Sequence, residues 1–130
     1  MTGTATYLHP LAPTEATQVA GAAIDTTFAR GVRIDIHLEA FVGGTTPSVT
    51  FLLETLGLDG RWFTAWTSGA VTAAPSDISV DVGQFAATYV AGTTTMAHAV
   101  LGTQTRLRWT FGGGVAPTSV TFSASVYPRQ

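Results

Sequence analysis

Runs of alternating apolar and polar residues recur along the chain. In residues 32–40 the apolar side chains occupy every second position, with Arg33, Asp35, His37 and Glu39 between them. A period of two is typical of a β-strand that turns one face to a core and the other outward. The same alternation returns in residues 49–53, 61–67, 78–82, 106–111 and 120–126, and we expect a further strand in 17–24. The pattern predicts an all-β fold of about seven to eight strands.

Glycine- and proline-rich turns separate these strands. The pair Asp59-Gly60 is a strong hairpin signal before residues 61–67. The segments 41–51 and 111–122 share one type of turn, in which glycines supply positive φ angles and a proline follows, so we predict two similar hairpins. Turns at such short intervals indicate an antiparallel β-sandwich, either jelly-roll-like or immunoglobulin-like.

Two segments depart from the strand pattern. Residues 1–16 contain Pro10 and Pro13 and show no period, which predicts an extended N-terminal arm before a single sandwich domain in residues 17–130. Residues 83–104 are the least regular part of that domain, and we interpret them as a long surface excursion. Because long ordered loops commonly carry function, contacts with other molecules are expected in these two segments.

The composition points to a chain that associates with other proteins. Hydrophobic residues make up 45% of it and charged residues only 11%, with a net charge of −2, whereas about 25% charged residues is usual. So little charge favours association. The six basic residues are all arginine and are scattered, which argues against nucleic-acid binding. No apolar stretch approaches the roughly 20 residues of a membrane span, cysteine is absent, and the start does not resemble a signal peptide.

One strand face carries residues that could bind a metal ion. Asp35, His37 and Glu39 share the outward face of residues 32–40, and a fourth ligand could come from Glu54 or His98. Same-face positions of one strand lie about 6.6 to 7 Å apart, too far for three of them to close a coordination shell. We therefore interpret them as solvated charges with arginine partners on a neighbouring strand, Arg106 or Arg108. The sequence predicts no metal site.

No catalytic arrangement is recognisable either. A G-x-S-x-G elbow is absent, and the glycines at 112–114 are not followed by the lysine of a phosphate-binding loop. Glu39 and Glu54 could neighbour one another across a hairpin, as the paired carboxylates of glycosidases do, but polar positions at a sheet edge are the simpler interpretation. We predict no catalytic residue, no cofactor and no enzymatic activity.

The aromatic residues divide into core and interface candidates. Trp62, Trp66 and Trp109 fit the core of a small sandwich, with Trp62 and Trp66 on one side of their strand and Phe63 and Ala65 on the other. If the first two tryptophans instead faced outward, they would form a platform suited to a sugar ring. Aromatic residues and methionine outside the regular strands are the candidate interface anchors, together with one leucine of the arm: Tyr7, Leu8, Tyr89, Met96 and Tyr127.

The ordered motifs of the strands resemble a known group of proteins. A Gly-Thr-Thr-Pro-Ser turn precedes Val-Thr-Phe-Leu-Leu-Glu at 49–54, then come Asp-Gly-Arg-Trp-Phe at 59–63 and Thr-Arg-Leu-Arg-Trp-Thr-Phe-Gly-Gly-Gly at 105–114. This series, between about Val32 and Val126 without the excursion, resembles small β-sandwich virion proteins of tailed bacteriophages. The excursion is longer than in that pattern, and the turn at 112–117 lacks the Thr-Thr of its counterpart.

The resemblance implies a structural role in a virus particle. We expect a capsid decoration or minor capsid protein, assembled in the host cytoplasm, that contacts the major capsid protein, other virion proteins and copies of itself, for instance as a trimer. The alternatives are a carbohydrate-binding module of a phage fibre or secreted enzyme, and a tail or head-tail connector component. Neither nucleic acid nor a membrane is expected as a partner.

Overall fold

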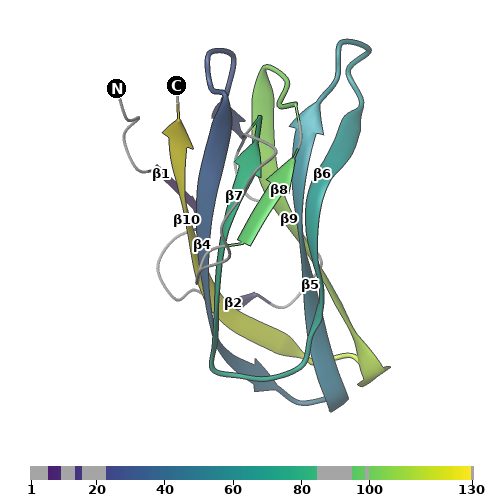
Figure 1. Ribbon diagram of the computed structural model, residues 1–130. Helices are drawn as coiled ribbons and strands as arrows, with labels where there is room; N and C mark the ends of the chain where they lie inside the picture. The colour runs from purple at the N-terminus through teal and green to yellow at the C-terminus, as the bar shows by residue number, and fades with distance from the viewer. Residues whose placement is uncertain (1–5, 10–13, 16–22, 85–94, 99, 130) are drawn as a thin grey trace.

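Two β-sheets pack face to face to form the protein (Figure 1). The computed structural model describes residues 6–9, 14–15, 23–84, 95–98 and 100–129, and this part of the chain contains ten strands and no helix. The prediction of an all-β sandwich is confirmed.

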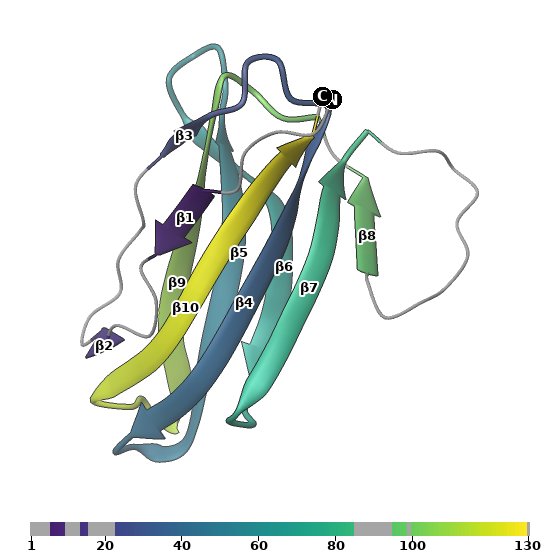
Figure 2. The same ribbon diagram turned by 90° about the vertical axis from the view of Figure 1, so that its left-hand side faces the viewer.

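Each sheet combines strands from distant parts of the sequence. Sheet A has the order β1-β10-β4-β7-β8, with β2 also beside β10 (Figure 2). Its strands are β1 (Thr6–His9), β2 (Thr14–Glu15), β4 (Gly31–Val42), β7 (Ser76–Gly83), β8 (Thr95–His98) and β10 (Ser119–Arg129). Sheet B has the order β3-β9-β5-β6. Its strands are β3 (Ile24–Asp25), β5 (Thr45–Leu56), β6 (Trp62–Val71) and β9 (Gln104–Val115). All pairs are antiparallel except β7 with β8.

The alternating apolar residues meet between the sheets. At the centre the ring of Trp109 meets that of Phe122 edge-on, with 4.9 Å between centroids, and Phe122 meets Phe51 in the same way at 5.0 Å. These three side chains come from β9, β10 and β5, so they join both sheets. Among the residues that the structure describes, fifteen buried hydrophobic ones make up the core, including Val32, Ile34, Ile36, Leu38, Val80, Val82 and Leu107.

The two glycine-proline turns connect the sheets rather than forming hairpins. The first turn leads from β4 in sheet A to β5 in sheet B. The second turn leads back from β9 in sheet B to β10 in sheet A. The prediction of two hairpins was wrong, because alternation shows which residues face a core but not which sheet a strand joins. Gly43 and Gly44 have φ angles of 73° and 81°, and a Cβ on Gly44 would lie 2.7 Å from the carbonyl oxygen of Val115. This close approach explains why the crossing requires glycine.

The similarity of the two crossing segments reflects their arrangement. Phe41 in the first segment pairs with Val120 in the second, and the corresponding residues Phe111 and Val49 pair in the same way. The two segments are thus related by an approximate two-fold symmetry, and the amide of Thr118 donates to the carbonyl of Val42 across it at 2.7 Å.

Short strands lie within both segments that the sequence pattern left irregular. In the predicted arm, β1 and β2 pair with β10, and in the predicted excursion β8 runs parallel to β7. Main-chain pairing at a sheet edge needs free N–H and C=O groups but no apolar alternation, so a search for alternation does not detect such strands. The strand expected in 17–24 is seen only as β3, since residues 16–22 lie outside the described part.

A bulge separates two tryptophans that the alternation placed together. The ladder between β5 and β6 shifts register between Leu53 and Glu54, so that Trp66 lies opposite Leu53 and Trp62 opposite Leu56. Leu53 and Leu56 are three positions apart on β5, and side chains an odd number of positions apart point to opposite sides of a strand. The two tryptophans opposite them therefore face opposite sides of sheet B. Trp66 packs against the core, whereas Trp62 lies on the outer face. The expectation that both share one side was wrong.

The two environments predict different costs for the same substitution. Trp109→Ala removes a ring that is 1% exposed and should lower the free energy of unfolding by about 3 to 5 kcal/mol. Trp62→Ala removes an outer side chain that stacks on Arg106 and should cost only about 1 kcal/mol. Chemical denaturation of both variants measures the difference, and equal losses would contradict this assignment of faces.

Candidate functional site

Three loops meet at one end of the sandwich (Figures 1 and 2). Large apolar side chains are exposed at this end. The loops comprise residues 26–30 before β4, 57–61 between β5 and β6, and 100–103 before β9. Of the seven exposed large hydrophobic residues in the described part, three lie in these loops and a fourth, Phe63, lies at the start of β6: Phe28 (83% exposed), Leu58 (106%), Phe63 (52%) and Val100 (66%). We call these four residues the apolar end. Such a cluster marks a contact surface, because isolated exposed apolar residues are ordinary but grouped ones are not.

A groove of about 680 Å³ runs between the loops of the apolar end. Its walls include Leu56, Leu58, Phe63, Val100 and Leu101, with threonines and glycines between them. None of the described lining residues carries a charge. The described lining of the groove therefore suits an apolar segment of a partner.

Buried threonines support the groove from below. The hydroxyl of Thr26 lies 2.9 Å from that of Thr105 and donates to the carbonyl of Gly102 at 2.8 Å. On the other side the amide of Gly102 donates to the hydroxyl of Thr55 at 2.6 Å, and Thr55 donates in turn to the carbonyl of Gln104. All three threonines are buried. Because buried hydroxyls with partners resist rearrangement, this network fixes the loops relative to each other.

Local turns hold two of the exposed side chains in place. The hydroxyl and amide of Thr27 donate to the Asp25 carboxylate at 2.6 and 2.9 Å, and these hydrogen bonds lower the pKa of Asp25 below its ordinary value. This turn precedes Phe28. In the next loop the amide of Gly57 donates to the carbonyl of Arg61 at 2.8 Å, closing the turn that carries Leu58. The hairpin predicted from Asp59-Gly60 is confirmed by the pairing of β5 with β6.

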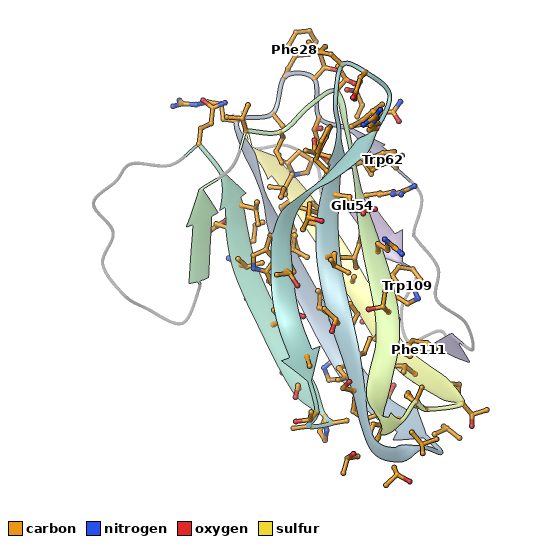
Figure 3. All side chains as sticks on the ribbon, turned by 90° about the vertical axis from the view of Figure 1, so that its right-hand side faces the viewer. Phe28, Glu54, Trp62, Trp109 and Phe111 are labelled. Atoms are coloured by element: carbon orange, nitrogen blue, oxygen red, sulfur yellow. The ribbon has the colours of Figure 1, made fainter. Side chains whose placement is uncertain are left out.

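The outer face of sheet B carries a compact charged cluster (Figure 3). The Glu54 side chain, only 7% exposed, accepts a hydrogen bond from Nε of Arg106 at 2.9 Å, and Nη1 of Arg108 lies 3.7 Å from its other oxygen. The guanidinium of Arg106 lies over the Trp62 ring, 4.2 Å from the centroid. We call Glu54, Trp62, Arg106 and Arg108 the arginine cluster. One carboxylate thus orients two arginines.

The outer face of sheet A carries the residues considered above as metal ligands. Asp35 accepts a hydrogen bond from Ser79 at 2.6 Å and pairs with Arg33, while Nδ1 of His37 lies 2.6 Å from Asp77. Glu39 lies at a bulge between β4 and β10. Within the described residues no three carboxylate or imidazole groups come together as a metal site would require. The absence of metal stays a prediction.

Several partners expected for these residues lie in the other sheet. Glu54, Arg106 and Arg108 belong to sheet B, so the expectation that the two arginines pair with the charges of β4 was wrong, as was that of Glu54 as a fourth ligand. Glu39 and Glu54 are not hairpin neighbours either, because β4 and β5 lie in different sheets. The cause is again the crossing at residues 43–44.

The predicted interface anchors are only partly described. Tyr127 lies opposite Arg33 on the outer face of sheet A and is 40% exposed. Tyr7 and Leu8 lie in β1 and Met96 in β8, but their side chains, like Tyr89 as a whole and the side chain of His98, lie outside the described residues. Tyr127 is not among the described residues that line the groove.

The residues of the apolar end were not among the predicted anchors. Leu58 stands within a Gly-Leu-Asp-Gly turn and Phe28 in a short connection before β4. A large apolar residue in a turn was the available signal, because turns ordinarily carry polar or small residues.

Comparisons with protein-family models, with curated proteins and with solved structures find no match. The described residues include no helix that is long and apolar enough to cross a membrane.

The threonine network predicts a specific cost when one hydroxyl is removed. Thr26→Val should lower the free energy of unfolding by about 1 to 3 kcal/mol, because the buried Thr105 hydroxyl and the Gly102 carbonyl lose a partner. Thr103→Val is the matched control, since Thr103 is exposed at the same end. Denaturant titration of both variants measures the effect. Similar stability of the two variants would show that the network does not hold the loops.

Proposed function

We propose that this chain is a structural protein that binds neighbouring proteins through its apolar end, as a virion component of a tailed phage. The observation that carries the proposal is the grouping of four exposed apolar residues at one end of the sandwich, where Leu58, Phe63 and Val100 line one groove and Phe28 follows Thr27 of its lining. Burying apolar surface contributes about 25 cal/mol per Å². Four such side chains in one patch are therefore enough to anchor a protein contact.

The hydrogen bonds that hold the loops support the interpretation that the exposed apolar residues form a binding surface. The threonine network and the turn at Asp25 hold the backbone of the apolar end, so little conformational entropy is lost when a partner covers it. The low fraction of charged residues, 11%, supports the same role, since much of the remaining surface can also be buried in an assembly.

The resemblance of residues 32–126 to small phage virion proteins supports the place of action. In this proposal the partner is the major capsid protein or another virion protein, and the chain stabilises the particle through many repeated contacts rather than by catalysis. Decoration or minor capsid protein is the role we favour, with tail or head-tail connector component as variants of the same mode of action.

One observation favours carbohydrate binding as a second candidate function. Trp62 lies on the outer face of sheet B, where an aromatic ring is available for stacking on a sugar. The guanidinium of Arg106 already stacks on the ring, however, which leaves less of it for a ligand. We therefore place this function second. A glycan-array screen of the chain and of Trp62→Ala tests it, with a saccharide signal lost in the variant as the supporting outcome.

The main proposal is tested by making the apolar end polar. The double variant Phe28→Ser, Leu58→Ser should fold as the parent does, because both side chains are exposed, and should no longer be incorporated when co-expressed with the virion proteins of its phage. The measurement is the amount of the chain in purified particles.

The opposite end of the sandwich provides a matched control. Val42 and Val115 are 52% and 59% exposed near the crossing segments, so Val42→Ser, Val115→Ser removes similar apolar surface elsewhere. It should be incorporated normally. Absence of the parent chain from particles would reject the virion role, and equal incorporation of both variants would reject the apolar end as the contact.

A further inference from the structure

A second groove lies on the outer face of sheet A, over the neighbouring strands β10, β4 and β7 (Figure 2). Its volume of about 380 Å³ is in the range of small-molecule sites. Seven polar residues of the described part line it: Ser123, His37 and Asp77 in one row across the strands, Ser125, Asp35 and Ser79 in the next, and Arg33 beyond them. We call these seven residues the polar groove. Its side chains suit a hydrophilic ligand, unlike those of the apolar end.

A buried hydroxyl group in this groove lacks a partner among the described residues. Ser123 is only 8% exposed and lines the polar groove, yet its hydroxyl forms no hydrogen bond with any described residue. The hydroxyl of Ser125, two positions further along β10, forms none either. Because buried polar groups ordinarily have hydrogen-bond partners, these hydroxyls point to a partner that enters the groove.

The charged side chains of the polar groove hold one another in place. One carboxylate oxygen of Asp35 accepts hydrogen bonds from the Ser79 hydroxyl at 2.6 Å and from Nε of Arg33 at 3.3 Å. The other oxygen of Asp35 accepts none from the described residues. Nδ1 of His37 donates to Asp77 at 2.6 Å, which leaves Nε2 of the ring for a further partner. The groove thus presents donors and acceptors whose positions are set before a ligand arrives.

An aromatic ring lies next to the polar groove on the same face. Tyr127 follows Ser125 by two positions on β10, so both side chains point outward, and it lies directly opposite Arg33. The tyrosine is 40% exposed. The face of an aromatic ring is electronegative, and it therefore attracts the C–H bonds on the apolar face of a sugar ring. Tyr127 adds such a stacking surface to the hydrogen-bonding groups beside it.

We propose that the polar groove binds a neutral saccharide, with a sugar ring against Tyr127 and sugar hydroxyls on Asp35 and Ser123. Sugar hydroxyls both donate and accept hydrogen bonds, so they match a groove that combines carboxylate acceptors, guanidinium donors and serine hydroxyls. A charged ligand is not favoured, because each carboxylate of the groove is already paired with Arg33 or His37. This site is separate from the apolar end and from the Trp62 ring, which belongs to the other sheet.

The experiment screens the purified chain on an array that carries neutral oligosaccharides of glucose, galactose, mannose and N-acetylglucosamine, and sialylated ones. Calorimetric titration then measures the affinity for the neutral sugar that binds. Ser123→Ala removes a hydroxyl without a partner in the described part, so this variant should keep the thermal stability of the parent and bind the sugar about tenfold more weakly. Tyr127→Ala should weaken binding to a similar extent, because the stacking contact is lost.

Two controls separate this site from the rest of the molecule. Ser48→Ala removes a similarly buried serine hydroxyl, 7% exposed, from β5 in the other sheet, and Trp62→Ala removes the ring considered above for sugar stacking. Both variants should bind the sugar as the parent does.

Three results would overturn the proposal: a parent that binds no sugar or only sialylated ones, parent-like binding by either Ser123→Ala or Tyr127→Ala, and loss of binding in Trp62→Ala. Thermal melts establish that each variant is folded. If Ser123→Ala unfolds, Tyr127→Ala carries the test, because its ring is exposed. None of these measurements depends on incorporation into particles, so this proposal and the virion role can fail independently.

Discussion

Burial of Trp109, Phe122 and Phe51 between the sheets is the constraint on which the rest of the structure depends. Because side chains alternate along a strand, fixing these residues inward fixes their neighbours outward. Arg108 precedes Trp109 on β9 and therefore points outward. Arg106, two positions before Arg108, shares this outer face and lies directly opposite Glu54. The arginine cluster is thus a consequence of how the core is filled. A one-residue slip of β9 would place charges in the core and Trp109 in solvent.

The apolar end depends on a different kind of interaction. Besides the packing of Leu101 against the core, its loops are held by hydrogen bonds among buried threonines, which tie residues 102–105 to β5 and to the segment before β4. Hydroxyl groups have directional requirements that apolar packing lacks. This explains how a surface with four exposed apolar side chains keeps a defined shape instead of collapsing onto itself.

The sequence predicts the strands well and their neighbours poorly. Residues 32–38, 106–111 and 120–126 were assigned correctly with their inward faces, because alternation is a local property, whereas the bulge at Glu39 turns Ala40 away from the core. The partner of each strand is a non-local property, and the crossing at Gly43 and Gly44 reads in the sequence like an ordinary hairpin turn. The face of Trp62 was wrong for a third reason, since a single bulge residue in β6 reverses the alternation. The apolar end combines three distant loops, which no local pattern brings together.

The crossing of the chain at Gly43 and Gly44 also affects the order in which the protein is completed during synthesis. β4 is synthesised well before β10, the last strand of the described chain, yet one of its two edges pairs with β10. Until the ribosome has released β10, that edge of β4 has no native neighbour. The nascent polypeptide must therefore keep the edge from pairing with other chains. This requirement is most severe when many ribosomes translate one messenger RNA, because the unpaired edges of several nascent chains then lie close together.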